Sequence, residues 1–175
     1  MRKNVEVFDY AGHICKALKK GVLLTTASDG QVNTMTIGWG TLGIEWNKPV
    51  FVAYVRESRF TRQILRENPE FTVNIPIGEV DSRILSHCGK VSGRDTDKIA
   101  DLGLTLVPSV KVSVPGLKEL PLTIECKLIY QKKQDLNVLP EAVLDRFYPA
   151  VNDEGCRDYH IAFYGEIVNA YIVGE

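Results

Sequence analysis

Two strand-forming segments joined by an Asp-Gly pair constrain the fold of this chain more than any other feature. Residues 22–27 and the stretch from Gln31 to about Trp39 are rich in apolar and β-branched side chains, and Asp29-Gly30 lies between them. Asp-Gly favours the tight two-residue turn of a β-hairpin. Because no crossover helix fits in so short a connection, the two strands must be antiparallel. The fold therefore cannot begin as a βαβ unit.

Helical spacing predicts short helices inserted among the strands. The first runs over about residues 10–20, with Asp9 as its N-cap and Gly21 as its stop. Ser58 is the expected N-cap of a second helix, which ends at Asn68-Pro69. Further helices are expected over residues 80–88, from a cap at Asp95 or Thr96 to Leu102, and after Pro140.

The remaining apolar segments are typical of strands. Residues 50–55 are apolar throughout, which predicts a strand covered on both faces. Other strands are expected over residues 70–75, 104–107, 111–114, 122–131 and about 159–173, the last with a kink at Gly165. Seven or so strands with frequent hairpin-type links predict a mainly β protein with α insertions, built as an antiparallel barrel. Periodicity alone does not separate a barrel from a sandwich.

Composition limits the classes of function. The chain has 175 residues, of which 45% are hydrophobic and 25% charged, with a net charge of −1. We expect one domain over residues 1–175 and neither nucleic acid nor a membrane as partner. The N-terminus lacks the long apolar core of a signal peptide, which favours the cytoplasm. Four cysteines and three histidines show no metal-binding spacing, so no metal site is expected.

One cluster of residues suits a phosphate. Arg56, Ser58, Arg59 and Thr61 surround the start of the second expected helix. A helix N-terminus exposes unpaired N–H groups and a partial positive charge, hydroxyls donate hydrogen bonds, and an arginine can hold two phosphate oxygens. The alternative is an ordinary N-cap followed by a solvated basic helix face.

The segment before that cluster suits a flat ring. From Asn33 to Thr41, polar residues are followed by Gly38 and Gly40 on either side of Trp39. Strand interiors normally avoid glycine, so these two glycines indicate that another group approaches the backbone closely. The alternative is a barrel corner that needs glycine, with Trp39 in the core.

A polar, glycine-containing segment runs from Cys88 to Lys98. Within it, Lys90, Ser92 and Arg94 can add to an anion or ring site. The alternative is a plain surface loop.

Two further residues have both a functional and a structural interpretation. Cys88 is a candidate nucleophile, but no carboxylate lies beside His87 in the sequence to orient that histidine, so a buried thiol is favoured. His160 on the last strand is either a satisfied structural residue or a member of the same pocket.

In their order along the chain, these segments resemble the flavin reductase-like family with the FMN-binding split-barrel fold, in particular its flavoredoxin-like members. The matching segments are Asn33–Trp39, Pro49–Thr61, Glu70–Pro76, Cys88–Lys98 and His160–Glu166. The resemblance covers almost the whole chain. It implies an antiparallel FMN-binding split β-barrel, and a homodimer with one FMN per subunit near the dimer interface.

The resemblance also implies roles for individual residues. Those along the flavin ring would be Asn33, Thr34, Met35, Thr36 and Ile37, with Thr36 and Thr41 nearest its reactive part. Those at the ribityl phosphate would be Arg56, Ser58, Arg59 and Thr61. Those closing another side of the pocket would be Cys88, Gly89, Lys90 and Val91. His160 would lie near the nicotinamide or the flavin and is the catalytic candidate.

The implied function is that of a flavoprotein oxidoreductase. NADH or NADPH would pass hydride to N5 of FMN, and no general base or nucleophile is required. No G-x-G-x-x-G motif follows a strand, so a nicotinamide nucleotide would bind in an open groove. The first alternative is an electron carrier with bound FMN, a redox partner protein and no nicotinamide activity. The second is a binding or sensory module that holds flavin or haem without turnover.

Overall fold

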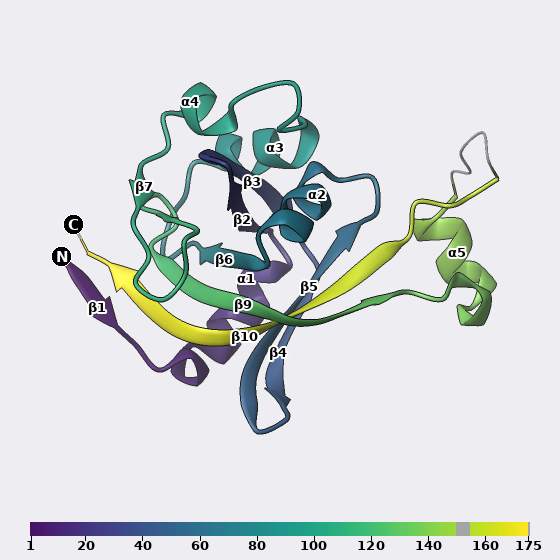
Figure 1. Ribbon diagram of the computed structural model, residues 1–175, viewed down its shortest axis with the longest axis horizontal. Helices are drawn as coiled ribbons and strands as arrows, with labels where there is room; N and C mark the ends of the chain where they lie inside the picture. Colours follow the sequence, from purple (N-terminus) through teal and green to yellow (C-terminus); the bar gives the residue numbers. More distant parts are fainter. Residues whose placement is uncertain (150–154, 175) are drawn as a thin grey trace.

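A curved antiparallel sheet is the centre of the fold (Figure 1). The computed structural model describes residues 1–149 and 155–174. The main sheet has the strand order β3-β2-β6-β9-β10-β5-β4, and β1 pairs with β10. Its strands are β1 (Arg2–Asn4), β2 (Val22–Ser28), β3 (Gln31–Ile37), β4 (Gly40–Glu45), β5 (Lys48–Arg56), β6 (Glu70–Ile75), β9 (Leu122–Lys133) and β10 (His160–Val173). A small second sheet pairs β7 (Leu106–Val107) with β8 (Gly116–Leu117).

The main sheet forms a split barrel. β3 and β4 follow each other in the chain, yet they stand at opposite ends of the strand order and form no ladder with each other in the part that the structure describes. Every pairing in this sheet is antiparallel. The predicted antiparallel, mainly β architecture is therefore confirmed, in an open form.

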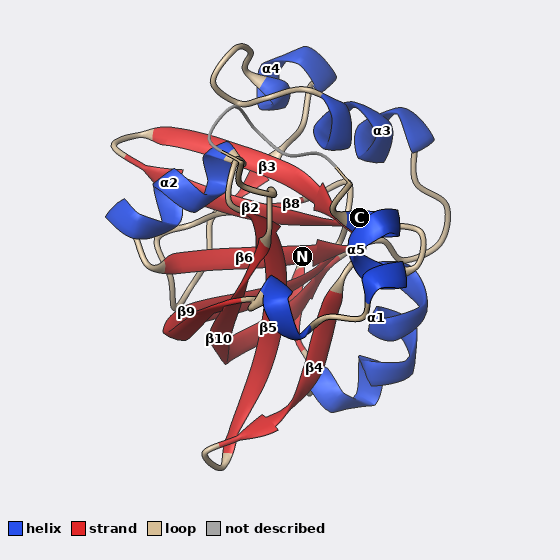
Figure 2. Ribbon diagram, turned by 90° about the vertical axis from the view of Figure 1, so that its right-hand side faces the viewer, coloured by secondary structure: helices blue, strands red, loops and turns tan. Residues whose placement is uncertain are grey.

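Short helices flank the sheet (Figure 2). They are η1 (Val7–Tyr10), α1 (Ala11–Leu18), α2 (Phe60–Glu67), α3 (Ser82–Lys90), α4 (Lys98–Leu102), η2 (Leu136–Val138) and α5 (Glu141–Phe147). α3 and α4 lie together over β3, while α5 lies at the far end of β9 and β10 (Figure 1). None of the described helices is long and apolar enough to cross a membrane.

The Asp29-Gly30 hairpin has the predicted geometry. β2 pairs with β3 up to Ser28, which lies opposite Gln31. Asp29 and Gly30 have φ values of 50° and 79°, as the two central residues of a type I′ turn require. The first two long strands are therefore antiparallel, as the short connection predicted.

The segment after β3 differs from the prediction. The strand expected to reach Trp39 ends at Ile37, and β4, which was not predicted, starts at Gly40. β4 pairs along the edge of β5, and a Cβ at Gly40 would lie 2.8 Å from the Phe51 ring. The close approach inferred from Gly40 is therefore that of a core side chain. Trp39 is 39% exposed and is not part of the core.

The main core lies between the sheet and α1. Phe51 and Phe71 from the sheet are completely buried there beside Ile14 of α1. Residues 50–55 alternate between this core and a smaller cluster on the opposite face of the sheet, so the prediction that both faces are covered is confirmed. The smaller cluster consists of Val50, Val52 and Ala162, with Tyr54 and Tyr164 packed against them.

Two helix caps differ from the predicted ones. Tyr10 occupies the N-cap position of α1, because Asp9 lies inside η1. Asp97 caps α4 in place of Asp95 or Thr96, since its carboxylate accepts two backbone N–H groups of the first turn at 3.0 and 3.2 Å. In both cases the acidic residue is close to the helix start, but the exact cap depends on backbone geometry that spacing does not specify.

Residues 111–114 form no strand, although one was expected. The completely buried Glu125 of β9 accepts the N–H groups of Val110 (3.0 Å) and Lys111 (2.6 Å). Because a carboxylate satisfies these N–H groups, the segment does not need a neighbouring strand. The strand expected over residues 104–107 is likewise shorter and is limited to β7.

The predicted kink at Gly165 is confirmed. β10 shifts register against β9 between Tyr164 and Gly165. A Cβ at Gly165 would lie 2.4 Å from the Phe71 ring, so the packing excludes a side chain here. On one side of the kink the two strands leave the barrel and carry α5 outward (Figure 1). Residues 134–149 and 155–159, which follow β9 and precede β10, are called the arm below.

Candidate functional site

A groove runs along β3 between α2, the loop after α3, and the arm. It consists of two cavities of about 210 and 130 Å³ that share Met35 and Arg59. The larger one, the aromatic cavity, is lined by Met35, Thr36, Ile37, Gly38, Trp39, Tyr54, Arg56, Arg59 and His160. The smaller one, the cationic cavity, is lined by Asn33, Met35, Ser58, Arg59, Phe60, Thr61, Val91, Ser92, Gly93, Arg94 and Lys98.

Most residues predicted to act on the cofactor line this groove. They are Asn33, Met35, Thr36, Ile37, Arg56, Ser58, Arg59, Thr61, Val91 and His160. These residues come from β3, from the junction of β5 and α2, from the loop after α3, and from the first position of β10. The fold thus brings four separate stretches of sequence to one place.

The other predicted residues lie away from the groove lining. Thr34 is completely buried, with its hydroxyl bonded inside the β2–β3 hairpin. Cys88 is 1% exposed on the buried side of α3, and burial raises the pKa of its thiol to about 11. Lys90 is exposed at the end of α3, and Thr41 lines a separate hollow on β4 and β5. Gly89 reaches the groove only through its carbonyl, which accepts a hydrogen bond from Arg59 at 3.4 Å. Their binding roles stay predictions.

Three positively charged side chains gather at the cationic cavity. Arg59 occupies the N-cap position of α2, Arg94 lies over the Phe60 ring at 5.2 Å, and Lys98 reaches in from α4. Lys98 is 4% exposed, its ammonium donates to the Thr34 carbonyl at 2.6 Å, and burial lowers its pKa. Among the residues that the structure describes, none of the three cations has a carboxylate partner. The cavity therefore favours an anionic group.

Asn33 gives the cationic cavity an unpaired acceptor. Its amide nitrogen donates to the Thr61 hydroxyl at 3.0 Å, while its buried carbonyl oxygen has no partner within the described ranges. A Cβ at Gly93 would lie 2.1 Å from that oxygen, so glycine is needed there. An unpaired buried acceptor costs roughly 1–3 kcal/mol. A ligand with hydroxyl or N–H donors would remove this cost, so the cavity fits a polar, hydroxylated anion.

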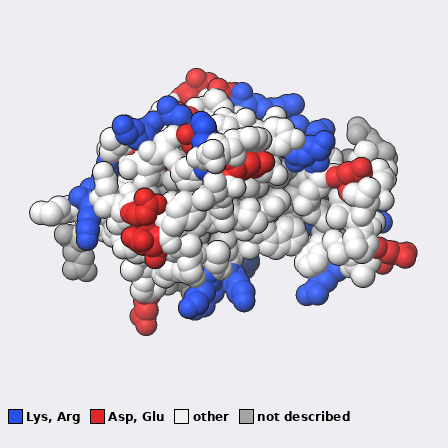
Figure 3. Space-filling model, turned by 90° about the horizontal axis from the view of Figure 1, so that it is seen from below, with Lys and Arg blue, Asp and Glu red and all other residues white. Residues whose placement is uncertain are grey.

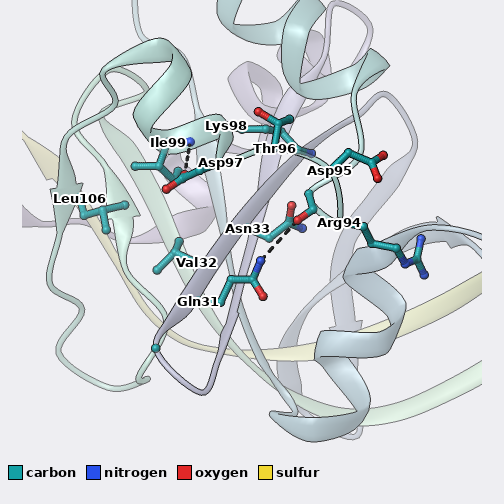
Figure 4. Close-up of a pocket in the computed structure, with 12 residues that line it drawn as sticks. Gln31, Val32, Asn33, Arg94, Asp95, Thr96, Asp97, Lys98, Ile99 and Leu106 are labelled. Carbon is teal, nitrogen blue, oxygen red and sulfur yellow. Dashed lines mark hydrogen bonds between the residues drawn. The ribbon is translucent and has the colours of Figure 1, made fainter.

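A third cavity, of about 430 Å³, lies on the other side of residues 93–98 (Figure 4). The Gln31 amide donates to the Gly93 carbonyl at 3.3 Å and so bridges β3 to this segment. Arg94 and Lys98 line this cavity as well as the cationic one, and the Arg94 side chain extends toward α2 (Figure 4). Asp95 and Asp97 add two carboxylates to its lining, so it favours an anion less than the cationic cavity does and is kept separate from the groove.

The arm engages two of the residues predicted to hold a phosphate. Arg56 donates to the carbonyl groups of Phe147 and Asp158, both at 2.8 Å. Ser58 donates its N–H and its hydroxyl to the Asp158 carboxylate, at 3.0 and 2.8 Å. The prediction that Ser58 caps α2 is wrong, because Arg59 occupies that position without a capping side-chain hydrogen bond. Arg56 and Ser58 therefore fasten the arm to the barrel.

His160 stands among aromatic side chains at the other end of the groove. Its ring centroid lies 4.6 Å from that of Trp39, which makes an edge contact with Phe147 at 5.2 Å. Its Nδ1 lies 2.8 Å from the Tyr148 hydroxyl. Burial, together with the Arg56 cation, lowers the pKa of His160 to about 4. The imidazole is therefore neutral at pH 7 and can contact a flat ligand without adding charge.

The contribution of the arm was missed in the sequence. The sequence predicted only a helical segment after Pro140, and Gln134, Tyr148 and Asp158 belong to no recognisable motif. The available signal was the aromatic pair Phe147-Tyr148 at the end of that helix. It does not reveal that both residues contact the groove from a projecting element.

Fold and groove together define a split-barrel protein with a candidate site for a flat, anionic ligand. Residues 16–175 match the family described as flavin reductase like domain. The match extends over most of the chain, which therefore belongs to the flavin reductase-like family, as the resemblance predicted.

Solved structures share this fold. Flavoredoxin of Desulfovibrio vulgaris (Miyazaki F) is 26% identical, with a TM-score of 0.64 and coverage of 87% of this chain and 69% of that chain. Nitrilotriacetate monooxygenase component B of Bacillus cereus has a TM-score of 0.67 and coverage of 99% and 79%. At 19% identity, this second likeness shows the fold alone.

Curated relatives are similar over shorter stretches. An uncharacterized protein of Archaeoglobus fulgidus is 32% identical over 97 residues, which are 55% of this chain and 54% of that protein. YddH of Escherichia coli is 30% identical over 122 residues, 67% of this chain and 64% of that protein. The chain thus spans about half to two thirds of the length of the curated relatives it matches.

Proposed function

We propose that this protein is an FMN-binding oxidoreductase that takes hydride from NADH or NADPH. The observation that carries the proposal is the groove, which joins a cavity with three cations to an aromatic cavity along β3. FMN has parts that match in order: a phosphate, a hydroxylated chain and a flat ring. When bound, FMN supplies a ring that accepts hydride and passes electrons on.

The phosphate is assigned to the cationic cavity. Arg59, Arg94 and Lys98 supply positive charge there, and the first turn of α2 adds the partial charge of its unpaired N–H groups. Arg56 and Ser58 are bonded to the arm, so we give them a secondary role in phosphate binding. Arg59 is therefore the principal phosphate residue of this proposal.

The hydroxylated chain and the ring are assigned to β3 and the aromatic cavity. Asn33 offers its unpaired carbonyl oxygen to a hydroxyl, and Met35 lines both cavities between the two ends of the ligand. Trp39 and His160 form an aromatic wall. No described residue needs to act as a nucleophile. Cys88, the candidate raised by the sequence, is buried and keeps its proton at neutral pH.

A second candidate function is a flavoredoxin-like electron carrier with bound FMN and a redox partner protein. The observation that favours it is the small volume of the aromatic cavity, about 210 Å³, beside an arm that is already fastened down. Pockets for small-molecule ligands usually measure about 300–1,000 Å³. A cavity of this size leaves little room for a nicotinamide ring next to a flavin.

One experiment separates these functions. The purified protein is mixed with FMN, its visible spectrum is recorded, and NADH or NADPH is added without oxygen. Bleaching of bound flavin at a rate above that of free FMN supports the reductase. A yellow protein bleached by a reduced ferredoxin, and by neither nicotinamide nucleotide, supports the carrier. A colourless protein that does not bind added FMN rejects both, and a Soret band indicates haem.

We also propose a homodimer and a single domain over residues 1–175. The family match and a sheet that pairs β1 with β10 support the single domain. Ile44 and Trp46 at the tip of the β4–β5 hairpin are 71% and 58% exposed, and Tyr130 of β9 is 44% exposed. Most of the middle of the face seen from below is uncharged (Figure 3). Apolar surface of this kind marks an interaction site.

A further inference from the structure

Gln134, Tyr148 and His160 form a hydrogen-bonded chain at the edge of the aromatic cavity. The Tyr148 hydroxyl lies 2.7 Å from Gln134 Oε1 and 2.8 Å from His160 Nδ1. A phenol has one hydrogen to donate. With Gln134 Oε1 facing the hydroxyl, Tyr148 donates its hydrogen to Gln134, and its oxygen is then left to accept a hydrogen bond from His160 Nδ1–H. This arrangement requires the proton of the neutral imidazole on Nδ1, which leaves the Nε2 lone pair free.

We propose that Tyr148, held by Gln134, is a positioning residue that fixes His160 in the Nδ1–H tautomer, so that Nε2 accepts a hydrogen bond from an N–H group of the ligand. Nε2 has no hydrogen-bond partner in the part of the chain that the structure describes, and His160 lines the aromatic cavity. The ligand class is a planar primary amide, which donates through its NH2 group. This inference rests on the proposed function, where the carboxamide of nicotinamide is such a group.

The chain of three residues is held in place by further contacts. The Tyr148 N–H donates to the Leu144 carbonyl at the end of α5 at 2.8 Å, and the Arg56 guanidinium lies 5.3 Å from the centre of the Tyr148 ring. The Gln134 N–H donates to the His160 carbonyl at 3.0 Å. Gln134 and His160, the two partners of the Tyr148 hydroxyl, are thus hydrogen-bonded to each other at the start of β10. Because these contacts fix the imidazole ring, its Nε2 can accept a hydrogen bond only from a ligand group in a defined position.

The tautomer decides what the groove recognises. With the proton on Nδ1, Nε2 selects a donor, while the other tautomer or an imidazolium would present N–H and select an acceptor. Burial keeps His160 neutral at pH 7, so the imidazolium is not populated there. Trp39, whose ring lies 4.6 Å from that of His160, gives a planar ligand a surface to pack against.

The test reads the tautomer directly. Long-range ¹H–¹⁵N NMR of flavin-free protein distinguishes a protonated from an unprotonated imidazole nitrogen, and we expect protonated Nδ1 and unprotonated Nε2 for His160. Tyr148→Phe should give a mixture of tautomers, because Nδ1 loses its acceptor. Tyr10→Phe is the matched control: Tyr10 ends η1, packs against the main core away from the groove, and its change should leave the His160 spectrum unchanged. A wild-type spectrum with the proton on Nε2 overturns the proposal.

Gln134→Leu provides a second and opposite change. Without its acceptor, the Tyr148 hydroxyl should donate to Nδ1 and move the proton to Nε2. Gln134→Glu keeps an acceptor and should retain the Nδ1–H tautomer. If Tyr148→Phe does not fold, the two Gln134 variants still test whether the Gln134–Tyr148 pair sets the His160 tautomer. A tautomer that is the same in wild type and Gln134→Leu overturns the positioning role.

Kinetics test the link to the ligand. Gln134→Leu should raise KM for the nicotinamide nucleotide about five- to tenfold, the effect of losing one hydrogen bond, with FMN affinity changed less than about twofold. If the wild type binds no FMN or is not reduced, the proposed function fails, while the NMR result for the tautomer still stands. A changed tautomer with unchanged KM in a working reductase overturns the recognition step.

Discussion

Arg56 and Arg59, at the junction of β5 and α2, have different partners. Arg56 donates to two carbonyl groups of the arm at 2.8 Å, whereas Arg59 lines both cavities and makes a longer hydrogen bond of 3.4 Å to Gly89. We predict that Arg59→Ala weakens FMN binding about ten- to a hundredfold, roughly 1.5–3 kcal/mol, because a charge-assisted hydrogen bond is lost. Titration of FMN fluorescence measures this change.

Arg66→Ala is the matched control for that variant. Arg66 is exposed in the last turn of α2, away from the groove, so its removal lowers the general positive charge and leaves the cavity unchanged. FMN affinity should change by less than about twofold, because salt screens an exposed charge at this distance. Unchanged affinity in Arg59→Ala would place the phosphate elsewhere, and equal losses in both variants would indicate non-specific attraction.

Burial of His160 makes stability depend on pH. The folded pKa of about 4 lies below the ordinary value of 6.5, so between these values the unfolded chain binds a proton that the folded protein does not. Stability should therefore rise with pH across this window and be complete above it. We predict that His160→Gln removes up to about 3 kcal/mol of this dependence. Urea unfolding of the wild type and His160→Gln between about pH 4 and 6.5 measures the free energy of unfolding. The same pH dependence in both proteins would contradict the prediction.

Hydrogen bonds that involve the side chains of Arg56, Ser58 and Asp158 hold the arm on the barrel. Neither α5 nor η2 contains a buried residue, while Asp158 accepts two hydrogen bonds from Ser58. We predict that Asp158→Ala increases hydrogen exchange at the Ser58 N–H about tenfold or more, because that group loses its acceptor. Exchange measured by mass spectrometry on peptides covering the start of α2 gives the result. Asp145→Ala, on the exposed side of α5, should leave it unchanged.

Elements with local signals were predictable, and elements that depend on distant partners were not. The Asp29-Gly30 turn and the Gly165 kink each follow from a glycine that the local backbone or packing requires. β4 begins at Gly40, a poor strand former, and it exists because the edge of β5 is there to pair with. The segment before β8 depends on Glu125, a buried carboxylate that sequence patterns would place on a surface.

The same distinction holds for the candidate site. β3 and the start of α2 were recognised because polar residues, glycines and arginines lie close together in the sequence. The partners of Arg56 and Ser58 lie about a hundred positions later in the arm, so no local pattern shows that the two residues are engaged. Tyr148 acquires its role only where its hydroxyl meets His160 in three dimensions.

At the scale of the whole molecule, the groove adjoins the outer face, the surface of β4, β5 and β9 that carries Ile44, Trp46 and Tyr130. Tyr54 lines the aromatic cavity and also the hollow of about 260 Å³ on β4 and β5, where Thr41 lies. A second subunit on this face would therefore stand beside the aromatic cavity. This arrangement would give Thr41, which lies outside the groove of its own subunit, a place near a flavin, and it connects the predicted dimer with the predicted site.

We predict that Trp46→Glu converts a dimer to a monomer, because it places a charge at an apolar contact from a residue that is 58% exposed in the single chain. Light scattering after size-exclusion chromatography measures the mass, and circular dichroism checks the fold. Val138→Glu is the matched control, since Val138 is 76% exposed on the arm and its change should leave the mass unaltered. If the wild type is already a monomer at micromolar concentration, the outer face does not join two copies. The groove must then bind its ligand without help from a second subunit.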